Sequence, residues 1–340
     1  MKVTGGGHVV ELGIDDERHH APEQHEMWQD SVVLCWWDLE RGVGGYHRIG
    51  HHPFHPDGPQ AQLTTNFFTA DLVYKRCGWV PLRPEDVTET GFGCGDDACR
   101  FDFTDHAVWT FHDEEVQGEL HITDFHPAVD IYPKSGQLAT RITAGHLEVG
   151  GSVTGRLRLH GTDYDIQGLA FRDHGWGKRF WEDFVAHRWI AGTFGPELTV
   201  LAVSVLGTDD DIVEFGCVIR DGELTYADSV DIITYLEGDG LTHRGGRLRM
   251  ELPGPEVVEV SLEPLQRGAV SWMVDLMAVT DTMCSMTIKR TINGTSNGTG
   301  SVRTGICNFE VSNNAGRGRF RPRFAVNGVT EDGLHHVSKR

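Results

Sequence analysis

A short segment near the middle of the chain gathers residue types that can move protons. Residues 168–184, GLAFRDHGWGKRFWEDF, contain Asp173 and His174, followed by Trp176 and Trp181. A carboxylate can orient an imidazole and raise its basicity, and an indole face can stabilise a developing cation. The glycines on both sides of Trp176 permit backbone geometry that a β-carbon would forbid. The pattern predicts an acid–base site; the structural alternative is a domain-junction loop with core aromatics and local charge pairs.

A second segment, residues 34–55 (LCWWDLERGVGGYHRIGHHPFH), is rich in histidine and raises the question of a metal. His47, His51 and His55 recur at every fourth position, but a glycine and two prolines among them disfavour the helix that would align them. We therefore predict no metal here and expect polar side chains that line the mouth of a cavity. A metal enzyme that uses the histidines at 47, 51, 52 and 55 remains an alternative. The predicted substrate-binding residues of this segment are Trp37, Tyr46, His47 and Arg48.

A third candidate lies in a late segment, residues 305–312 (GICNFEVS), which reads as a strand. Alternation places Cys307, Phe309 and Val311 on one face and Ile306, Asn308 and Glu310 on the other. A charged residue on a strand is usually solvated, so Glu310 is proposed as a proton donor only together with the family argument below.

The elements that must position these residues are strands. Along most of the chain, apolar and polar residues alternate with a period of two. These segments are rich in β-branched and aromatic residues and are separated by turns that contain Gly, Asp, Asn and Pro. The pair Asp221–Gly222 lies between two such runs and predicts a tight hairpin. Helical patterns are scarce, and a run of strands without helices favours antiparallel sandwiches or barrels. We predict an all-β protein, and the length of 340 residues indicates two β domains, 1–178 and 179–340.

The composition of the chain limits which classes of partner it can bind. With 50 acidic and 30 basic residues the formal net charge is −20, so a nucleic-acid backbone would be repelled. No apolar run reaches the roughly 18 residues that cross a bilayer, and the N-terminus does not read as a signal peptide. Seven scattered cysteines without a CxxC pair indicate reduced thiols and a cytoplasmic location. A homodimer is compatible with these features.

The motifs resemble those of the carotenoid 1,2-hydratase (hydroxyneurosporene synthase) superfamily. DHGWG, preceded by GLAFR and followed by KRFW, is similar to its G-x-x-x-x-D-H-S-W-G-x-R-x-W signature. GGYHRIGHHP is similar to its N-terminal segment, and GICNFEVS resembles its closing strand. The resemblance implies two packed lipocalin-like β domains with a pocket at their interface, and relatives that include lipocalin-like cyclases. His174 and Trp176, with Asp173 beside them, correspond to residues implicated in the hydratases.

One departure from the family pattern bears on the reaction. The hydratases carry a Tyr-x-Asp pair downstream of the histidine, where this chain reads Leu201-Ala202-Val203-Ser204. The carotenoid reaction itself is therefore not expected.

The sequence predicts a cofactor-independent acid–base enzyme, a hydro-lyase, isomerase or cyclase, that acts on a small apolar unsaturated molecule such as a terpenoid, steroid or polyketide. Asp173 or Glu310, with a pKa raised by desolvation, would supply the proton, and His174 would hold the acid or deprotonate water. The indoles expected to face a cation are those of Trp176 and Trp181, with Trp37 or Trp189. The alternative is a lipocalin-type binding protein in which Asp173 and His174 only clamp the domains together.

Overall fold

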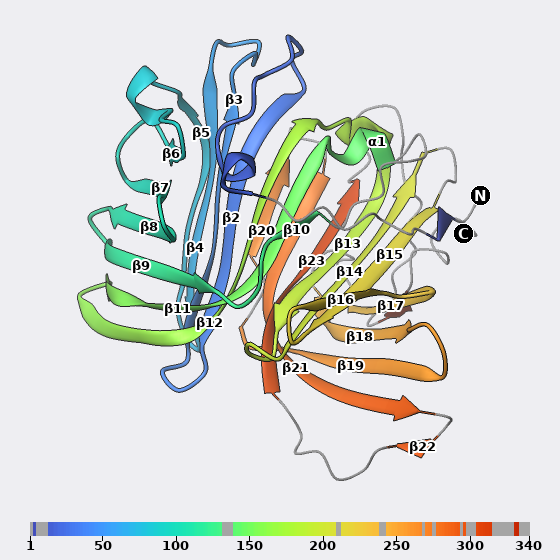
Figure 1. Ribbon diagram of the computed structural model, residues 1–340. Helices are drawn as coiled ribbons and strands as arrows, with labels where there is room; N and C mark the ends of the chain where they lie inside the picture. The colour runs from blue at the N-terminus through green and yellow to red at the C-terminus, as the bar shows by residue number, and fades with distance from the viewer. Residues whose placement is uncertain are drawn as a thin grey trace. The chain divides into compact units, whose positions relative to one another are not determined.

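The computed structural model divides the chain into two compact units (Figure 1). The described residues are 3–4, 13–130, 139–208, 212–237, 243–266, 269–273, 277–292, 295–296, 304–314 and 330–332. The N-terminal unit comprises the described residues within Val9–Tyr132 and Arg141–Arg179, and the C-terminal unit those within Met1–His8, Pro133–Thr140 and Phe180–Arg340. The domain boundary predicted between residues 178 and 179 stays a prediction.

The N-terminal unit is built on one curled antiparallel sheet (Figure 1). Its elements are η1 (Ile14–Glu17), β2 (Trp28–Asp38), β3 (Val43–His52), β4 (Gln60–Thr69), β5 (Val73–Pro81), η2 (Pro84–Asp86), β6 (Gly91–Gly93), β7 (Cys99–Phe103), β8 (Ala107–His112), β9 (Val116–Asp124), β10 (Val129–Asp130), β11 (Gly145–Leu159) and β12 (Thr162–Lys178). The sheet runs β5-β4-β3-β2-β12-β11-β9-β8-β7-β6, and β10 adds to β11. The one-turn helix α1 (Ala139–Ile142) precedes β11 in the chain.

Alternate residues of these strands form the core of the N-terminal unit. Trp36, Phe67, Trp109 and Phe111 are buried together inside the curl of the sheet. Each such side chain contributes about 1.5–3 kcal/mol relative to exposure to water. The period of two read from the sequence is therefore the period with which side chains enter this core.

The C-terminal unit repeats this plan with a second curled sheet (Figure 1). Its elements are β1 (Val3–Thr4), η3 (Trp181–Asp183), β13 (Phe184–Thr193), β14 (Leu198–Gly207), β15 (Ile212–Arg220), β16 (Glu223–Tyr226), β17 (Ser229–Leu236), β18 (His243–Glu251), β19 (Glu256–Pro264), β20 (Ala269–Met273), β21 (Met277–Ile292), β22 (Thr295–Ser296), β23 (Thr304–Asn314) and β24 (Thr330–Asp332). The main path is β1-β15-β14-β13-β23-β21-β19-β18-β17-β24, antiparallel except where β1 joins β15. Its core gathers aliphatic side chains around Phe309.

The prediction of an all-β protein of antiparallel sheets is confirmed. The hairpin predicted at Asp221–Gly222 is also confirmed: both residues have positive φ, 51° and 82°, and they connect β15 to β16. Cys307, Phe309 and Val311 face the core, as alternation predicted for the late strand. Among the described residues, no helix has the length and apolarity that crossing a membrane requires.

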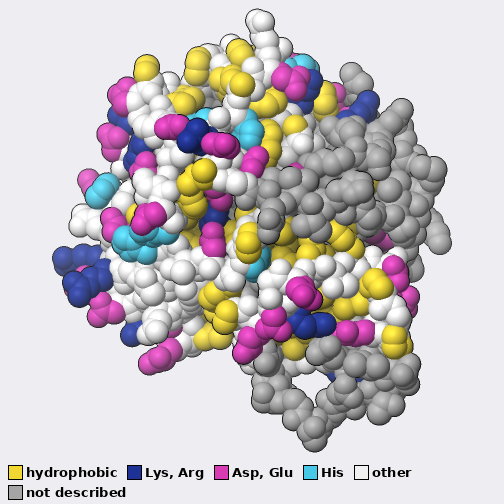
Figure 2. All heavy atoms as spheres, viewed as in Figure 1, with side chains coloured by type: hydrophobic (Ala, Val, Ile, Leu, Met, Phe, Trp, Pro, Cys, Tyr) yellow, Lys and Arg dark blue, Asp and Glu magenta, His cyan; other side chains and the backbone are white. Residues whose placement is uncertain are grey.

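Charges on the surface are mixed rather than sorted. Figure 2 shows lysine and arginine side chains in small groups, most of them next to acidic side chains. At the far end of the β11–β12 hairpin, for example, Arg156 pairs with Asp165 at 3.2 Å, and both side chains are exposed. Pairs of this kind contribute little to stability.

Candidate functional site

The register of β12 decides which of the predicted residues meet. His174 lies opposite Val32 of β2 and Leu147 of β11, whereas Asp173 lies opposite the next residue of each strand. Successive side chains of a strand point to opposite faces, so Asp173 and His174 do not share a site. His174 and Trp176 lie on the face that forms the interior of the N-terminal unit. The structure therefore does not bring together the adjacent carboxylate and imidazole expected to cooperate.

The carboxylate partner of His174 is Asp30 of β2. His174 Nε2 lies 2.7 Å from Asp30 Oδ1, and the two side chains are 1% and 4% exposed. Burial alone would lower the pKa of His174, but the charge of Asp30 and the hydrogen bond to it raise that pKa above its ordinary value. Burial alone would raise the pKa of Asp30, but His174 lowers it to well below its usual range. Both shifts favour the form of the pair in which His174 is an imidazolium and Asp30 a carboxylate.

Two further histidines complete the surroundings of Asp30. The peptide N–H of His20 donates to Asp30 Oδ2 at 2.8 Å, and Nδ1 of His19 lies 3.6 Å from the same oxygen. The His20 ring stacks on the indole of Trp176 with ring centroids 3.5 Å apart. A side chain at Gly145, opposite Trp176, would collide with this indole, which explains glycine there.

A buried ion-pair network attaches the histidine-bearing segment to β12. Arg172, two residues before His174, donates to both carboxylate oxygens of Glu17 at 2.8 and 3.0 Å and also to Asp124 of β9. Arg172 is 3% exposed. Because Glu17 ends η1, just before His19 and His20, this network determines where those two rings lie.

Phe92 of β6 packs against the ring of His174, with centroids 5.4 Å apart. His19 Nε2 contacts the carbonyl oxygen of Gly91 at 2.9 Å, and His51 Nε2 contacts that of Gly93 at 2.7 Å, so two histidines hold the strand on either side of Phe92. Burial lowers the pKa of His51 to about 4, so at neutral pH its uncharged ring donates the bond.

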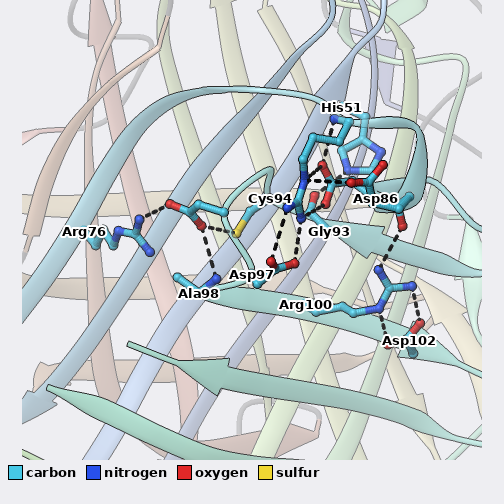
Figure 3. A network of polar contacts seen from close by, with 12 residues as sticks. His51, Arg76, Asp86, Gly93, Cys94, Asp97, Ala98, Arg100 and Asp102 are labelled. Carbon is cyan, nitrogen blue, oxygen red and sulfur yellow. Dashed lines mark hydrogen bonds and ion pairs between the residues drawn. The ribbon is translucent and has the colours of Figure 1, made fainter. Parts of the chain in front are cut away.

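Figure 3 shows how the segment around β6 is held by ion pairs. Arg83 donates to Asp86 and Asp97 at 2.8 and 2.6 Å, and Arg100 pairs with Asp102. Arg76 pairs in the same way with Asp96. These contacts fix the backbone that carries Phe92, and thereby one wall of the site.

The other predicted residues of the N-terminal unit divide between the two faces of the sheet. Trp37, Tyr46 and Arg48 lie on the same face as Asp173, opposite to His174, so Tyr46 and Arg48 do point the same way, as predicted. Arg48 donates to Gln62 and Gln29 at 2.9 and 3.0 Å. On this face His146 Nε2 lies 4.0 Å from Asp173.

His47 instead lies in the apolar core. Trp36 Nε1 donates to His47 Nε2 at 2.9 Å, and burial lowers the pKa of His47 to about 3. It is a neutral core histidine rather than part of a polar cavity mouth. His52 and His55 lie against Trp79, away from His47.

Three predicted residues belong to the C-terminal unit. Trp181 is in η3 and packs edge-on against Phe184. Trp189 of β13 lies opposite Glu310 of β23 and is 4% exposed. Glu310 Oε1 accepts a hydrogen bond from Ser312 Oγ at 2.6 Å, and His187 Nδ1 lies 3.0 Å from the same oxygen.

Among the described residues, one group has the side chains and spacing to hold a metal ion: His20, Asp30 and His174, whose ligand atoms lie within 4.8 Å of one another. Two imidazoles and a carboxylate form a donor set used for zinc and iron. The histidines at 47, 51, 52 and 55, which the sequence suggested as ligands, do not form this group.

A pocket of about 420 Å³ lies at the other end of the β11–β12 hairpin. It is lined by Gln117, Arg156, Arg158 and Tyr164, among others. None of the predicted site residues lines it.

The family model described as "Domain of unknown function (DUF7064)" matches residues 13–315. The chain belongs to this family. No curated protein matches the DUF7064 chain in sequence.

Solved structures resemble it in fold. A candidate AttH from Nitrosomonas europaea aligns with a TM-score of 0.65 at 13% identity, over 92% of this chain and 98% of that one. CghA with Sch210972 aligns with a TM-score of 0.60 at 14% identity, over 86% and 90%. Kievitone hydratase from Nectria haematococca aligns with a TM-score of 0.57 at 8% identity, over 84% and 88%. The predicted all-β, lipocalin-like fold of two domains is thus confirmed.

Sequence reasoning missed Asp30, His20 and Arg172 in this DUF7064 chain. Asp30 lies 144 residues before His174, and only the pairing of β2 with β12 brings them together. A signal was present: Asp30 is a carboxylate at the start of an apolar strand, WQDSVVLCWW, and a His-His pair precedes that strand. A buried strand seldom contains an acidic residue without a partner.

Proposed function

We propose that the protein is a cofactor-independent acid–base enzyme, a hydro-lyase or an isomerase or cyclase, that acts on a small apolar unsaturated molecule. The observation that carries the proposal is the His174–Asp30 ion pair, which is almost fully buried beside Trp176. Shifted pKa values on two buried groups in contact are typical of sites that transfer protons.

The proton that His174 transfers is the one on Nδ1. Asp30 accepts the hydrogen bond from Nε2, and Nδ1 is a buried atom with no hydrogen-bond partner in the described part of the chain. In the imidazolium form Nδ1–H donates a proton to the substrate, which becomes a cation. The neutral ring can then take a proton from the water that adds to this cation or from a neighbouring carbon of it. Asp30 keeps the ring oriented through both states.

The aromatic neighbours suit a substrate that gains positive charge. The indole of Trp176 lies 5.4 Å from the His174 ring between centroids, and Phe92 lies at the same separation. Electron-rich ring faces stabilise a cation at such distances. Terpenoids, steroids and polyketides with a reactive double bond are the proposed substrate classes.

The structural relatives support this proposal without establishing the activity. One of them is named a hydratase, and another was solved with Sch210972. The substrate pocket between the domains, which the family resemblance implies, stays a prediction.

Deuterium transfer tests the proposal. The purified protein is incubated with a mixed terpenoid, steroid and polyketide extract, bound compounds are identified by mass spectrometry, and each is then incubated with protein in D₂O. We expect deuterium at carbon in at least one bound compound, and we expect its loss in His174→Gln, which keeps an amide donor toward Asp30 but removes Nδ1. His106→Gln, which alters an exposed His–Asp pair, is the matched control. Bound compounds that exchange no deuterium would instead show a carrier protein.

A further inference from the structure

The C-terminal unit has a polar cluster on the sheet face opposite to its core. Ile190, Phe309 and Val311 point into that core, so the alternate residues His187, Glu310 and Ser312 point away from it. β13, β23 and β21 lie side by side here, as Figure 1 shows. The cluster is nevertheless largely buried: the His187 and Glu310 side chains are 15% and 13% exposed, and Ser312 is fully buried.

The hydrogen bonds determine which nitrogen of His187 carries the proton. Ser312 Oγ donates to Glu310 Oε1 at 2.6 Å, and His187 Nδ1 lies 3.0 Å from the same oxygen. Since an ionised carboxylate only accepts hydrogen bonds, Nδ1 of His187 must be the donor. When the ring is uncharged, Nε2 therefore keeps its lone pair.

The Nε2 atom of His187 is buried, and no described residue forms a hydrogen bond to it. A buried polar atom without a partner destabilises the fold, so such atoms call for an explanation. An imidazole held by a carboxylate at one nitrogen, with the other nitrogen free, is the arrangement of a general base.

We propose that the C-terminal unit carries a second proton-transfer site, in which His187 Nε2 is a general base oriented by Glu310. The ligand is a small apolar molecule with an acidic C–H or O–H. The inference deepens the proposed function and rests on it for the substrate class. Nε2 takes the proton, the electron pair of the broken bond stays on the substrate, and Glu310 stabilises the imidazolium. The proton is released to water, which restores the neutral ring.

Neighbouring polar residues keep this face suited to a polar reaction. Asp281 of β21 lies opposite Glu310, and Asn308 Nδ2 donates to Asp281 Oδ1 at 3.0 Å. Trp189 lies opposite Glu310 on β13 and supplies an apolar surface next to the base. Charged, amide and indole groups are thus combined around one imidazole.

The experiment uses 5-nitrobenzisoxazole, an apolar probe whose C3–H is removed by a base while its N–O bond breaks to give a coloured cyanophenolate. The full-length protein, His187→Asn and the exposed-histidine control His106→Gln are compared. Asparagine at 187 keeps a donor in the place of Nδ1 but removes the Nε2 base. We expect His187→Asn to lower the probe rate about 100-fold, and His106→Gln to leave it within about twofold.

Two further measurements separate a base from a structural residue. Added imidazole should restore the probe rate of His187→Ala, which a loss of packing alone would not allow. Glu310→Gln should move the pH dependence of the probe rate to lower pH, because the imidazolium loses the carboxylate that stabilises it and the neutral base then persists to lower pH; a profile unchanged from that of the parent protein overturns the role of Glu310.

The inference is overturned by any of three results: a parent protein no faster than free imidazole, an unchanged rate in His187→Asn, or an equal loss of rate in His106→Gln. The probe reports only a base, so its outcome is independent of the deuterium experiment. Probe turnover by His187 without deuterium transfer would reject the proposed function but retain this site.

Discussion

Each unit holds a histidine–carboxylate pair, and the two pairs leave opposite nitrogens available. His174 contacts Asp30 through Nε2, and its Nδ1 has no hydrogen-bond partner in the described structure; His187 contacts Glu310 through Nδ1, and the same is true of its Nε2. The first pair is almost fully buried, whereas the second is slightly more exposed and its carboxylate also accepts from Ser312. In the two proposals, the same two residue types thus give a proton in one unit and take one in the other.

The largest effect is expected from removing the transferable proton of the N-terminal pair. With the compound identified by deuterium transfer, His174→Gln should lower kcat about 1,000-fold, whereas the His106→Gln control should not change it. Steady-state kinetics at neutral pH measures both. Equal losses in His174→Gln and His106→Gln would remove the distinction between a catalytic and a structural histidine.

The network that supports the N-terminal pair should contribute to stability as well. Arg172→Met leaves the Glu17 carboxylate buried without its partner, and we expect the free energy of unfolding to fall by about 3 kcal/mol. Arg156→Met, which breaks an exposed ion pair on the same hairpin, should change it by less than about 1 kcal/mol. Urea unfolding followed by fluorescence gives both values; similar losses would show that burial of Arg172 has no special role.

Acid should act on the N-terminal unit through its core histidines. The pKa of His47 is about 3 in the folded protein, below its ordinary value of 6.5, so protons bind more readily to the unfolded chain. The resulting stabilisation is complete above pH 6.5 and is lost as pH falls, at about 1.4 kcal/mol per pH unit for one histidine. His47→Phe should reduce this slope between pH 6 and 4 in chemical unfolding. An unchanged slope would contradict a neutral buried His47.

The ion pair at His174 should set one limb of the pH profile. Because Asp30 raises the pKa of His174, activity that needs the imidazolium is present at low pH and is lost as pH rises through that pKa. In Asp30→Asn the charge that raises the pKa of His174 is removed while burial still lowers that pKa, so the limb should move to lower pH. A profile of kcat/KM against pH tests this, and a limb that stays in place would assign it to another group.

The smallest effect is expected from metal removal. His20, Asp30 and His174 have the donor set for a metal, yet an acid–base role for His174 needs a proton where a metal would bind. Dialysis against EDTA should therefore leave kcat unchanged. Loss of activity that zinc or iron restores would make this group a metal centre and end the comparison between the two pairs.

The fold was predictable because its information is local. The alternation of apolar and polar residues along a strand, and turn pairs such as Asp221–Gly222, depend on neighbours in sequence. Both were confirmed. The candidate site was predictable only in its β12 half, through the motif that holds His174 and Trp176. Asp30 could not be assigned as its partner because strand pairing across 144 residues depends on tertiary structure. That Asp173, the residue before His174, faces the other way follows from alternation along β12, and it was missed because this motif was not read as a strand.

One consequence follows from the way β12 is threaded between β2 and β11. Adjacent residues of this strand face opposite sides of the sheet. Whether a residue has an odd or an even position in the strand therefore decides its partner: His174 contacts Asp30, and Asp173 lies near His146. A single residue inserted within β12 ahead of position 173 would exchange these assignments if the downstream pairing shifted by one. An insertion or deletion in this strand can thus change which reactive side chains contact one another without replacing any of them.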